Sequence, residues 1–397
     1  MLATRIPKNV FLLSLCQALG TTGNLLVMTV TALIGHLLAP PEFATLPIAF
    51  QFLAASLVTI PISYFMKNWG RKAGFFLGAI SGCVGALINV FAIINHNFVA
   101  FCIGSFFFGM MAGIAQFYRY AAVDSAGEEY RSQTISLVLA GSILAALVGP
   151  ELAKWSRNLV MDIEFVGTYL VVASLPLLTS LILFVTPIAA PSEEEKQNSG
   201  RSLPVLLRQG RLWVAVLGAV VGYASMTLLM VATPLAMRAN HLVFNDVAFV
   251  IQWHVLGMYA PSLITGHLIR RWGVLNIMLL GAVFVSACIL INLQGTSLNH
   301  FWWALFCLGV GWNFLFIGAT TLLTYTYEIE ERAKVQAFNE LLVFSTTALA
   351  ALFSGWLLHN LGWGSINQLV LIPIGLITLS ILGLKMAGGD LVGKVST

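Results

Sequence analysis

The chain has 397 residues, of which 58% are hydrophobic and 9% are charged, and its net charge is +4. Soluble domains carry about 25% charged residues, so a water-soluble fold of this length is excluded. The small net charge gives no reason to expect a nucleic-acid partner. We expect an integral membrane protein whose surroundings are the lipid bilayer.

Twelve apolar stretches of about 20 residues follow one another along the chain, and each can cross a hydrocarbon core of about 30 Å as a helix. We expect helices because lipid cannot satisfy exposed backbone groups, and a β-barrel would show short alternating segments instead. Arg5 and Lys8 precede the first stretch, as in a signal peptide, but its length favours an uncleaved span. The predicted spans are residues 10–34, 44–66, 73–95, 98–121, 131–153, 164–187, 211–237, 246–268, 274–294, 299–323, 335–358 and 364–386.

The positive charges indicate how these spans are oriented. With the N-terminus in the cytoplasm, the outer loops hold only Lys154, Arg157 and Arg238, which leaves 17 of the 20 Lys and Arg residues on the inner side. Such a bias is typical of the positive-inside rule. It predicts a multi-pass protein of the plasma membrane, in a bacterium the inner membrane, with both termini cytoplasmic.

The sequence contains no pattern typical of a cofactor or metal site. The cysteines all fall within predicted spans at spacings that match no metal motif, namely Cys16, Cys83, Cys102, Cys288 and Cys307. Phosphate-binding glycine loops and nucleophile motifs are missing as well. We therefore predict no cofactor, no metal and no catalytic residues.

A polar segment divides the spans into two sets of six, and the two sets resemble each other. GTTGNLLVMTVTAL at residues 20–33 aligns with GYASMTLLMVATPL at 222–235, and NWGRKAGFFLGA at 68–79 aligns with RWGVLNIMLLGA at 271–282. The offsets of 202 and 203 residues indicate an internal duplication. We predict an N-terminal six-helix bundle at 1–187, a cytoplasmic linker at 188–210 and a C-terminal six-helix bundle at 211–397.

Twelve spans in two repeated halves, with a basic loop between the second and third spans, resemble the major facilitator superfamily. The loop motif of that family is Gly-x-x-x-Asp-Arg-x-Gly-Arg-Arg. In this sequence Gly70, Arg71 and Lys72 match its end, while Lys67 stands where the family has Asp.

The corresponding loop of the second half carries a more degenerate copy of the motif. Gly266 and Gly273 match its glycines, Arg271 fits the Arg position, and Arg270 replaces the Asp. The resemblance implies an all-α membrane fold of two pseudo-symmetric six-helix bundles. It also implies a monomer that moves a small-molecule substrate by alternating access, as the two bundles rock about a central site.

In the family this loop favours the outward-open state, and its acidic residue meets the N-terminal end of the eleventh span. Because Lys67 is a cation, we predict that it pairs with Glu340 in that span. A second hypothesis pairs Arg71 with Asp124, and the alternative is that these cations are solvated topology markers. The full set of candidate gating residues is Lys67, Gly70, Arg71, Lys72, Asp124, Arg270, Arg271, Gly273 and Glu340.

Polar side chains within the spans are the candidate substrate-binding groups, because they are costly in lipid and face a bundle interior or a cavity. The alternative role is hydrogen bonding between helices, worth about 0.6 kcal/mol per pair in membranes. In the family, spans one, four, seven and ten line the central cavity and spans two, five, eight and eleven flank it. The candidates on these spans are Gln17, Asn24, Gln51, Gln116, Arg119, Tyr223, Gln252, His254, Trp312 and Asn313.

Amide, hydroxyl and aromatic groups dominate this set, which suits an uncharged or weakly charged polar molecule with a stackable ring. The centres of spans one and four carry no acid, so proton coupling and facilitated diffusion both stay open. The candidates for a proton-carrying group are His254, Arg119 with Asp124, Glu151 and Glu340.

We therefore predict a secondary active transporter of a small polar or amphiphilic organic solute. The alternatives of the same fold are a facilitative uniporter and a drug or metabolite exporter. A polytopic membrane enzyme or a transporter-like sensor is the alternative from another class.

Overall fold

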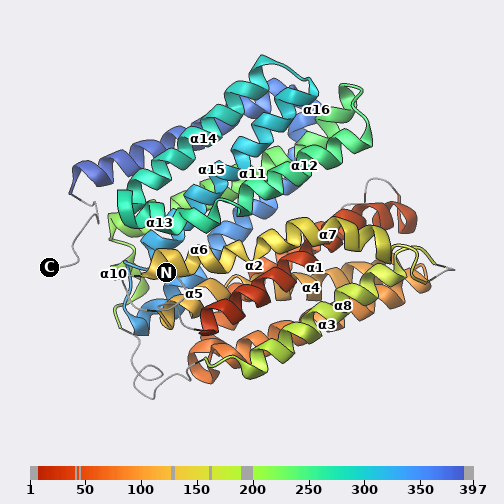
Figure 1. Ribbon diagram of the computed structural model, residues 1–397, viewed down its shortest axis with the longest axis horizontal. Helices are drawn as coiled ribbons and strands as arrows, with labels where there is room; N and C mark the ends of the chain where they lie inside the picture. The colour runs from red at the N-terminus through yellow and green to blue at the C-terminus, as the bar shows by residue number, and fades with distance from the viewer. Residues whose placement is uncertain are drawn as a thin grey trace. The chain divides into compact units, whose positions relative to one another are not determined.

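The computed structural model describes residues 8–40, 43, 46–126, 130–160, 163–188 and 200–388. Within these ranges the long elements are all α-helices (Figure 1). They are α1 (Lys8–Leu38), α2 (Leu46–Trp69), α3 (Arg71–Ile94), α4 (Phe98–Ala115), α5 (Tyr118–Asp124), α6 (Arg131–Ala140), α7 (Ser142–Ser156), α8 (Val166–Val185), α10 (Leu203–Leu206), α11 (Gly210–Ala239), α12 (Phe244–Tyr259), α13 (Ser262–Trp272), α14 (Val274–Gln294), α15 (Leu298–Leu323) and α16 (Arg332–Met386). Residues 189–199 of the predicted linker lie outside the described ranges.

The helices confirm the prediction of twelve membrane spans. Among the described residues, 11 helical stretches are long and apolar enough to cross a membrane, and the last of them runs over 58 residues. That stretch includes Gly362, whose φ of 79° is not helical. Glycine adopts this conformation readily, so the stretch contains two consecutive helices, and the spans at 335–358 and 364–386 are separate.

Three of the spans are each built from two shorter helices. The fourth span breaks between α4 and α5 at Gln116 and Phe117, and the fifth between α6 and α7 at Gly141. The eighth breaks between α12 and α13, where Pro261 has no N–H to donate to the preceding turn. At such a break some backbone N–H and C=O groups lose their helical hydrogen bonds, and other groups must then supply a partner.

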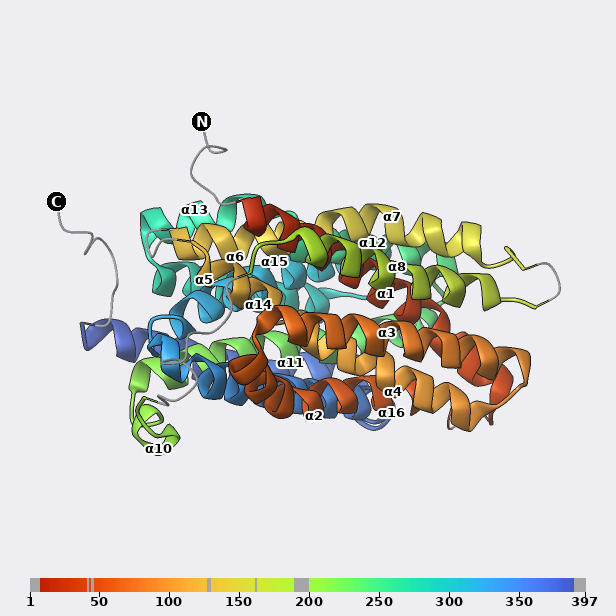
Figure 2. The same cartoon turned by 90° about the horizontal axis from the view of Figure 1, so that it is seen from below.

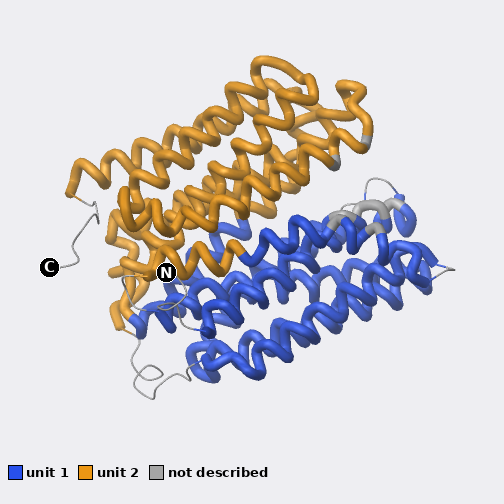
Figure 3. Tube along the Cα trace, viewed as in Figure 1, with its two compact units in different colours: residues 1–127, 141–199, 329–345 blue, residues 128–140, 200–328, 346–397 orange. Residues whose placement is uncertain are grey.

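The described residues form two compact units, shown in blue and orange in Figure 3. Unit 1 contains residues 1–127, 141–199 and 329–345, and unit 2 contains residues 128–140, 200–328 and 346–397. The first part of α16 therefore packs with helices from the beginning of the chain, and α6 packs with helices from the second half. The division of the chain into bundles at 1–187 and 211–397 stays a prediction.

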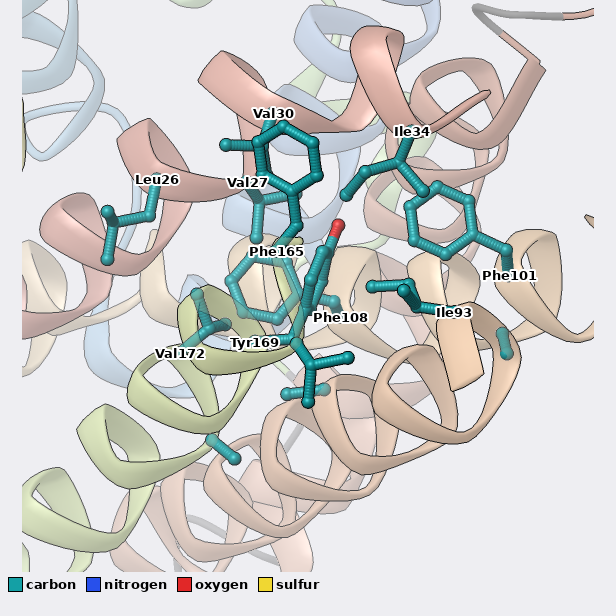
Figure 4. Packing of buried hydrophobic residues seen from close by; sticks show 14 of the residues in the cluster. Leu26, Val27, Val30, Ile34, Ile93, Phe101, Phe108, Phe165, Tyr169 and Val172 are labelled. Atoms are coloured by element: carbon teal, nitrogen blue, oxygen red, sulfur yellow. The ribbon is translucent and has the colours of Figure 1, made fainter. Parts of the chain in front are cut away.

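In unit 1, α3 lies between α4 and α8, and α1 packs on α7 and α8 (Figures 1 and 2). Lipid is as apolar as these helices, so close packing and hydrogen bonds hold them together more than the hydrophobic effect does. Figure 4 shows the buried cluster, in which Leu26, Val27, Val30 and Ile34 of α1 gather with Phe101, Phe108, Tyr169 and Val172. One face of α1 is thereby used for packing.

Helices α2 and α4 approach each other closely at one glycine. A Cβ atom on Gly109 of α4 would collide with the backbone carbonyl of Gln51 on α2. The absent side chain lets the two backbones meet, as small residues commonly do between membrane helices. This contact fixes the position of Gln51 in the unit.

In unit 2, α15 is the central helix and packs against α11, α12 and α14. Helix α6 packs against α13 through hydroxyl groups that bond to the backbone at Gly266. Ser132 Oγ donates to the Gly266 carbonyl oxygen at 3.0 Å, and the Gly266 N–H donates to Ser136 Oγ at 3.0 Å. These two bonds between α6 and α13 involve only serine hydroxyls and backbone groups.

Candidate functional site

Unit 1 brings two predicted amide side chains into contact. Gln51 Nε2 donates to Asn24 Oδ1 over 2.7 Å. Gln51 is 2% exposed, whereas Asn24 is only half-buried. The pair joins α1 to α2 on the polar side of α1.

A second polar contact lies about two turns away along α1. Gln17 Nε2 donates to Thr21 Oγ1 at 3.2 Å, and that hydroxyl lies 2.9 Å from Ser142 Oγ on α7. All three side chains are buried. Only the contact between Thr21 and Ser142 joins two helices, and it is of the kind that we gave as the alternative to substrate binding.

A buried ion pair lies where the fourth span breaks. Arg119 Nη2 is 2.6 Å from Glu340 Oε1, and both side chains are at most 2% exposed. The same oxygen accepts from the Tyr120 hydroxyl at 2.9 Å and from Asn339 Nδ2 at 2.9 Å. Gln116 accepts a 2.6 Å bond from Arg119 Nη1, so both partners of the pair have further hydrogen bonds. A buried charge pair needs such bonds to offset its desolvation.

The predicted pairing of Lys67 with Glu340 is wrong, because Glu340 is taken by Arg119. Lys67 instead lines a small cavity together with Arg332 and Gln336, at the start of α16. At a rise of 1.5 Å per residue, Glu340 lies about 6 Å further along the helix than Gln336. The end of α2 therefore meets α16 at a different level.

The predicted contact between Arg71 and Asp124 is confirmed. Arg71 Nε is 2.7 Å from Asp124 Oδ2, and its Nη2 donates to Gln336 at 3.3 Å. Arg332 approaches the same carboxylate oxygen at 3.1 Å. Lys72 donates to the carbonyl oxygen of Phe184 at 2.8 Å, at the end of α8. Two of the predicted gating cations, Arg71 and Lys72, are thus bound within unit 1 rather than serving as solvated markers.

The two loop glycines turn the chain as expected. Gly70 has a φ of 89° and Gly273 a φ of 86°, and each connects two antiparallel helices. Only glycine adopts such angles without strain. In unit 2, Arg270 lies over the ring of Tyr130 at 5.3 Å, and Arg271 is exposed.

Unit 2 contains a cluster of four aromatic rings, two of which were predicted as site residues. Trp312 and Phe316 stack at a centroid distance of 5.0 Å, and Tyr223 meets both rings edge-on at 5.2 and 4.9 Å. Tyr259 meets Trp312 edge-on at 5.8 Å. Trp312 is buried and Tyr223 half-buried, so the ring of Tyr223 is the more accessible of these two.

The break between α12 and α13 explains the contacts of Asn313. Its Nδ2 donates to the carbonyl oxygen of Met258 and to Ser262 Oγ, both at 2.6 Å. Its Oδ1 accepts from Thr265 at 2.7 Å. These bonds use both amide hydrogens and satisfy the Met258 carbonyl, three residues before Pro261. Asn313 therefore holds the broken span against its own helix, α15.

The two remaining candidates on the eighth span are Gln252 and His254, and neither takes part in the ring contacts of the aromatic cluster described above. Gln252 is exposed. His254 is fully buried, and its Nδ1 lies 2.8 Å from the carbonyl oxygen of Leu305 on α15. This histidine is thus held in the packing between α12 and α15.

Several residues of these networks were not predicted from the sequence. Tyr120 and Asn339 complete the bonds to the Glu340 carboxylate. Gln336 precedes Glu340 by four residues, and this spacing puts both on one face of the helix. Two polar residues at that spacing in an otherwise apolar span were the signal that would have located the network.

Comparisons with known proteins identify the family. Residues 10–324, and again residues 215–387, match the model of the Major Facilitator Superfamily. The chain belongs to this family. It is therefore a multi-pass membrane transporter of a small molecule and not an enzyme.

One relative of the transporter is much more similar than the solved structures are. The riboflavin transporter RfnT of Brucella anthropi is 39% identical over 392 residues, which cover 97% of this chain and 98% of that protein. The crystal structure of FucP in its outward conformation has a TM-score of 0.71 at 16% identity, over 95% of this chain and 98% of that one. A bacterial homologue of the iron transporter ferroportin has a TM-score of 0.75 at 11% identity, over 96% and 100%. At such identities the two structures support the fold alone.

Proposed function

We propose that this transporter carries riboflavin, or a flavin closely related to it. The observation that carries the proposal is the 39% identity to a riboflavin transporter along nearly the full length of both chains.

The polar and aromatic groups within each unit are of the kind that riboflavin requires. Its isoalloxazine ring is planar and uncharged and carries carbonyl and N–H groups, and its ribityl chain carries hydroxyl groups for further hydrogen bonds. Unit 1 offers the amides of Asn24 and Gln51, and unit 2 offers the half-buried ring of Tyr223 in an aromatic cluster. Stacking of two aromatic rings contributes about 0.5–1.5 kcal/mol beyond the area that they bury.

The proposed mechanism is secondary transport by alternating access, across the inner membrane of a bacterium, by a monomer with both termini in the cytoplasm. The charge bias of 17 inner to three outer cations supports that orientation. For coupling we favour protons, because the buried Glu340 carboxylate lies within a membrane-spanning helix, where ionisable groups are commonly functional. A facilitative uniporter is the alternative, and a flux measurement decides between them.

The experiment is uptake of riboflavin by a bacterial riboflavin auxotroph that lacks an importer of its own. We expect growth at low riboflavin only when the transporter is expressed, and an exporter would give no such growth. Purified protein in liposomes then shows whether a pH gradient drives riboflavin above its equilibrium level. Absence of riboflavin flux above that of empty liposomes would overturn the proposal.

A variant links the flux to the aromatic cluster. Tyr223→Ala removes one stacking surface, and we expect the KM for riboflavin to rise about 2- to 10-fold, as follows from the stacking energy. Trp356→Ala serves as the control, because Trp356 is an exposed ring of α16 in the same unit. An equal effect of both substitutions would contradict a role of the cluster in binding.

A further inference from the structure

The Asn24–Gln51 pair has hydrogen-bonding groups that the protein leaves unused. Among the described residues, Gln51 Oε1 is shielded from solvent and has no hydrogen-bond partner. Asn24 is half-buried and accepts the bond from Gln51 at its Oδ1, and no described residue accepts a bond from its Nδ2. The bonded pair therefore has one vacant acceptor, Gln51 Oε1, and one vacant donor, Asn24 Nδ2.

This arrangement holds for either orientation of the two amides. If each amide is turned by 180°, Asn24 Nδ2 donates to Gln51 Oε1 instead, and the vacant groups become Gln51 Nε2 and Asn24 Oδ1. Each orientation leaves one donor next to one acceptor, because every amide carries both. The pair thus complements a ligand edge that also carries a donor beside an acceptor.

The surroundings of the pair hold it in place. Gln51 lies where α2 meets the Gly109 backbone of α4, so its side chain starts from a fixed point. The buried core of α1 lies on the face of Leu26 and Val30, away from Asn24. A preorganised pair loses little conformational freedom when a ligand binds, and this favours specificity.

Buried polar groups are almost always satisfied, and an exception requires an explanation. Gln51 Oε1 is shielded from solvent in this conformation, and a group that enters with the ligand can supply its missing bond. An anionic ligand would place a second acceptor against this oxygen, and a cation would meet no carboxylate in the pair. The fitting ligand is neutral.

We propose that Asn24 and Gln51 recognise the imide edge of the transported ring, meaning an N–H flanked by two carbonyl groups. The ring N–H donates to the vacant amide oxygen, and an adjacent carbonyl accepts from the vacant amide N–H. The proposal rests on riboflavin transport, since the isoalloxazine ring carries this edge at its N3 position. It adds the contact by which the protein selects the ring.

The consequence is discrimination against a ring whose imide nitrogen is blocked. A site that bonds to a substrate N–H rejects the analogue that lacks it, because its own polar group is then left unpaired. For one such bond we expect N3-methylriboflavin to bind about 10- to 100-fold more weakly than riboflavin. A flavin with an ethyl in place of the 8-methyl group adds the same carbon at the far end of the ring, and it controls for size.

The experiment measures how well each analogue competes with riboflavin uptake in proteoliposomes, for the wild type and for Gln51→Met and Asn24→Leu. We expect the wild type to discriminate against the N3-methyl analogue, and each variant to lose most of that discrimination. Asn24→Asp and Gln51→Glu keep the side-chain sizes but replace the vacant N–H by a second acceptor. If the apolar variants fail to fold, we expect each of these to raise the KM for riboflavin, because the ring carbonyl then meets an acceptor. An unchanged KM in both would overturn the imide contact.

Asn292→Leu is the matched control. Asn292 Nδ2 donates to Asn367 Oδ1 at 2.8 Å, so this is also a buried amide pair between membrane helices, but it lies in unit 2. We expect this variant to keep the discrimination, whatever it does to stability. Loss of discrimination in the control as well would overturn the inference.

The outcomes separate the two proposals. If riboflavin and the N3-methyl analogue are transported equally well by the wild type, the imide contact is wrong and riboflavin transport stands. If the wild type transports neither, riboflavin transport is wrong. In that case, thermal-shift measurements with uracil-type imides and their N-methylated forms test the Asn24–Gln51 pair directly. Thermal shifts that do not depend on methylation would overturn the imide contact.

Discussion

The ion pair between Arg119 and Glu340 allows the sharpest test of the structure. Both side chains are at most 2% exposed, and the Nη2–Oε1 distance is 2.6 Å. Removing one partner leaves the other as an uncompensated buried charge, which costs about 3–5 kcal/mol. We therefore expect Glu340→Leu and Arg119→Met each to lower the free energy of unfolding by that amount.

The double substitution should cost far less than the sum of the two. Because it removes both charges, no isolated ion remains, and the replacement of a buried pair by apolar side chains is often nearly neutral. The resulting coupling energy is at least about 3 kcal/mol, which a double-mutant cycle measures directly. The assay is unfolding of the purified protein in mixed micelles by a denaturing detergent, followed by tryptophan fluorescence.

An exposed ion pair of the same unit is the control for this cycle. Arg157 and Glu164 are also 2.6 Å apart, but their side chains are 53% and 43% exposed. Solvent screens such pairs, so their coupling energy should be about 0.2–1 kcal/mol. If the cycle at Arg119 and Glu340 gives a value within that range, burial does not strengthen this pair and the reasoning fails.

Three further substitutions test contacts seen in the structure. Gly109→Val should separate α2 from α4 at Gln51 and lower the yield of folded transporter, with a loss of about 1–3 kcal/mol from overpacking; normal stability would contradict the close approach. Asn313→Leu should lower the free energy of unfolding by about 1–3 kcal/mol, because it leaves buried polar groups of the broken span unsatisfied. The selectivity between riboflavin and its N3-methyl analogue should stay unchanged in competition assays. Arg71→Lys should lose about 1.5–3 kcal/mol, since a single ammonium cannot reproduce the contacts of the guanidinium with both Asp124 and Gln336. Thermal unfolding that matches the wild type would count against this prediction.

The spans themselves were predictable because the signal for each is long and local. A helix in lipid must satisfy its own backbone over about 20 residues, so hydropathy locates it without knowledge of its neighbours. The turn glycines Gly70 and Gly273 were also predictable, because they lie between two such stretches. The break at Gly362 separates the last two spans at the polar gap that the sequence indicates.

The pairing of charges was only partly predictable. Arg71 and Asp124 lie at helix ends that the positive-inside pattern predicts on the same side of the membrane, so the pattern brings them to the same level. The error for Lys67 arose because hydropathy places a residue along its helix only to within a few positions. A difference of one turn, about 5.4 Å, is enough to change the partner of Glu340.

The sequence by itself determined the class of protein, the number of spans and the set of polar side chains within them. These follow from the cost of placing charges and backbone groups in lipid, which acts on each segment separately. Only the tertiary structure decided the role of each polar residue. Asn313 and Asn24 are both amides in membrane spans, yet one uses both amide hydrogens at a broken helix and the other keeps its amide nitrogen unused. Among the described residues that difference depends on which side chain and which carbonyl the helix packing brings within 3 Å.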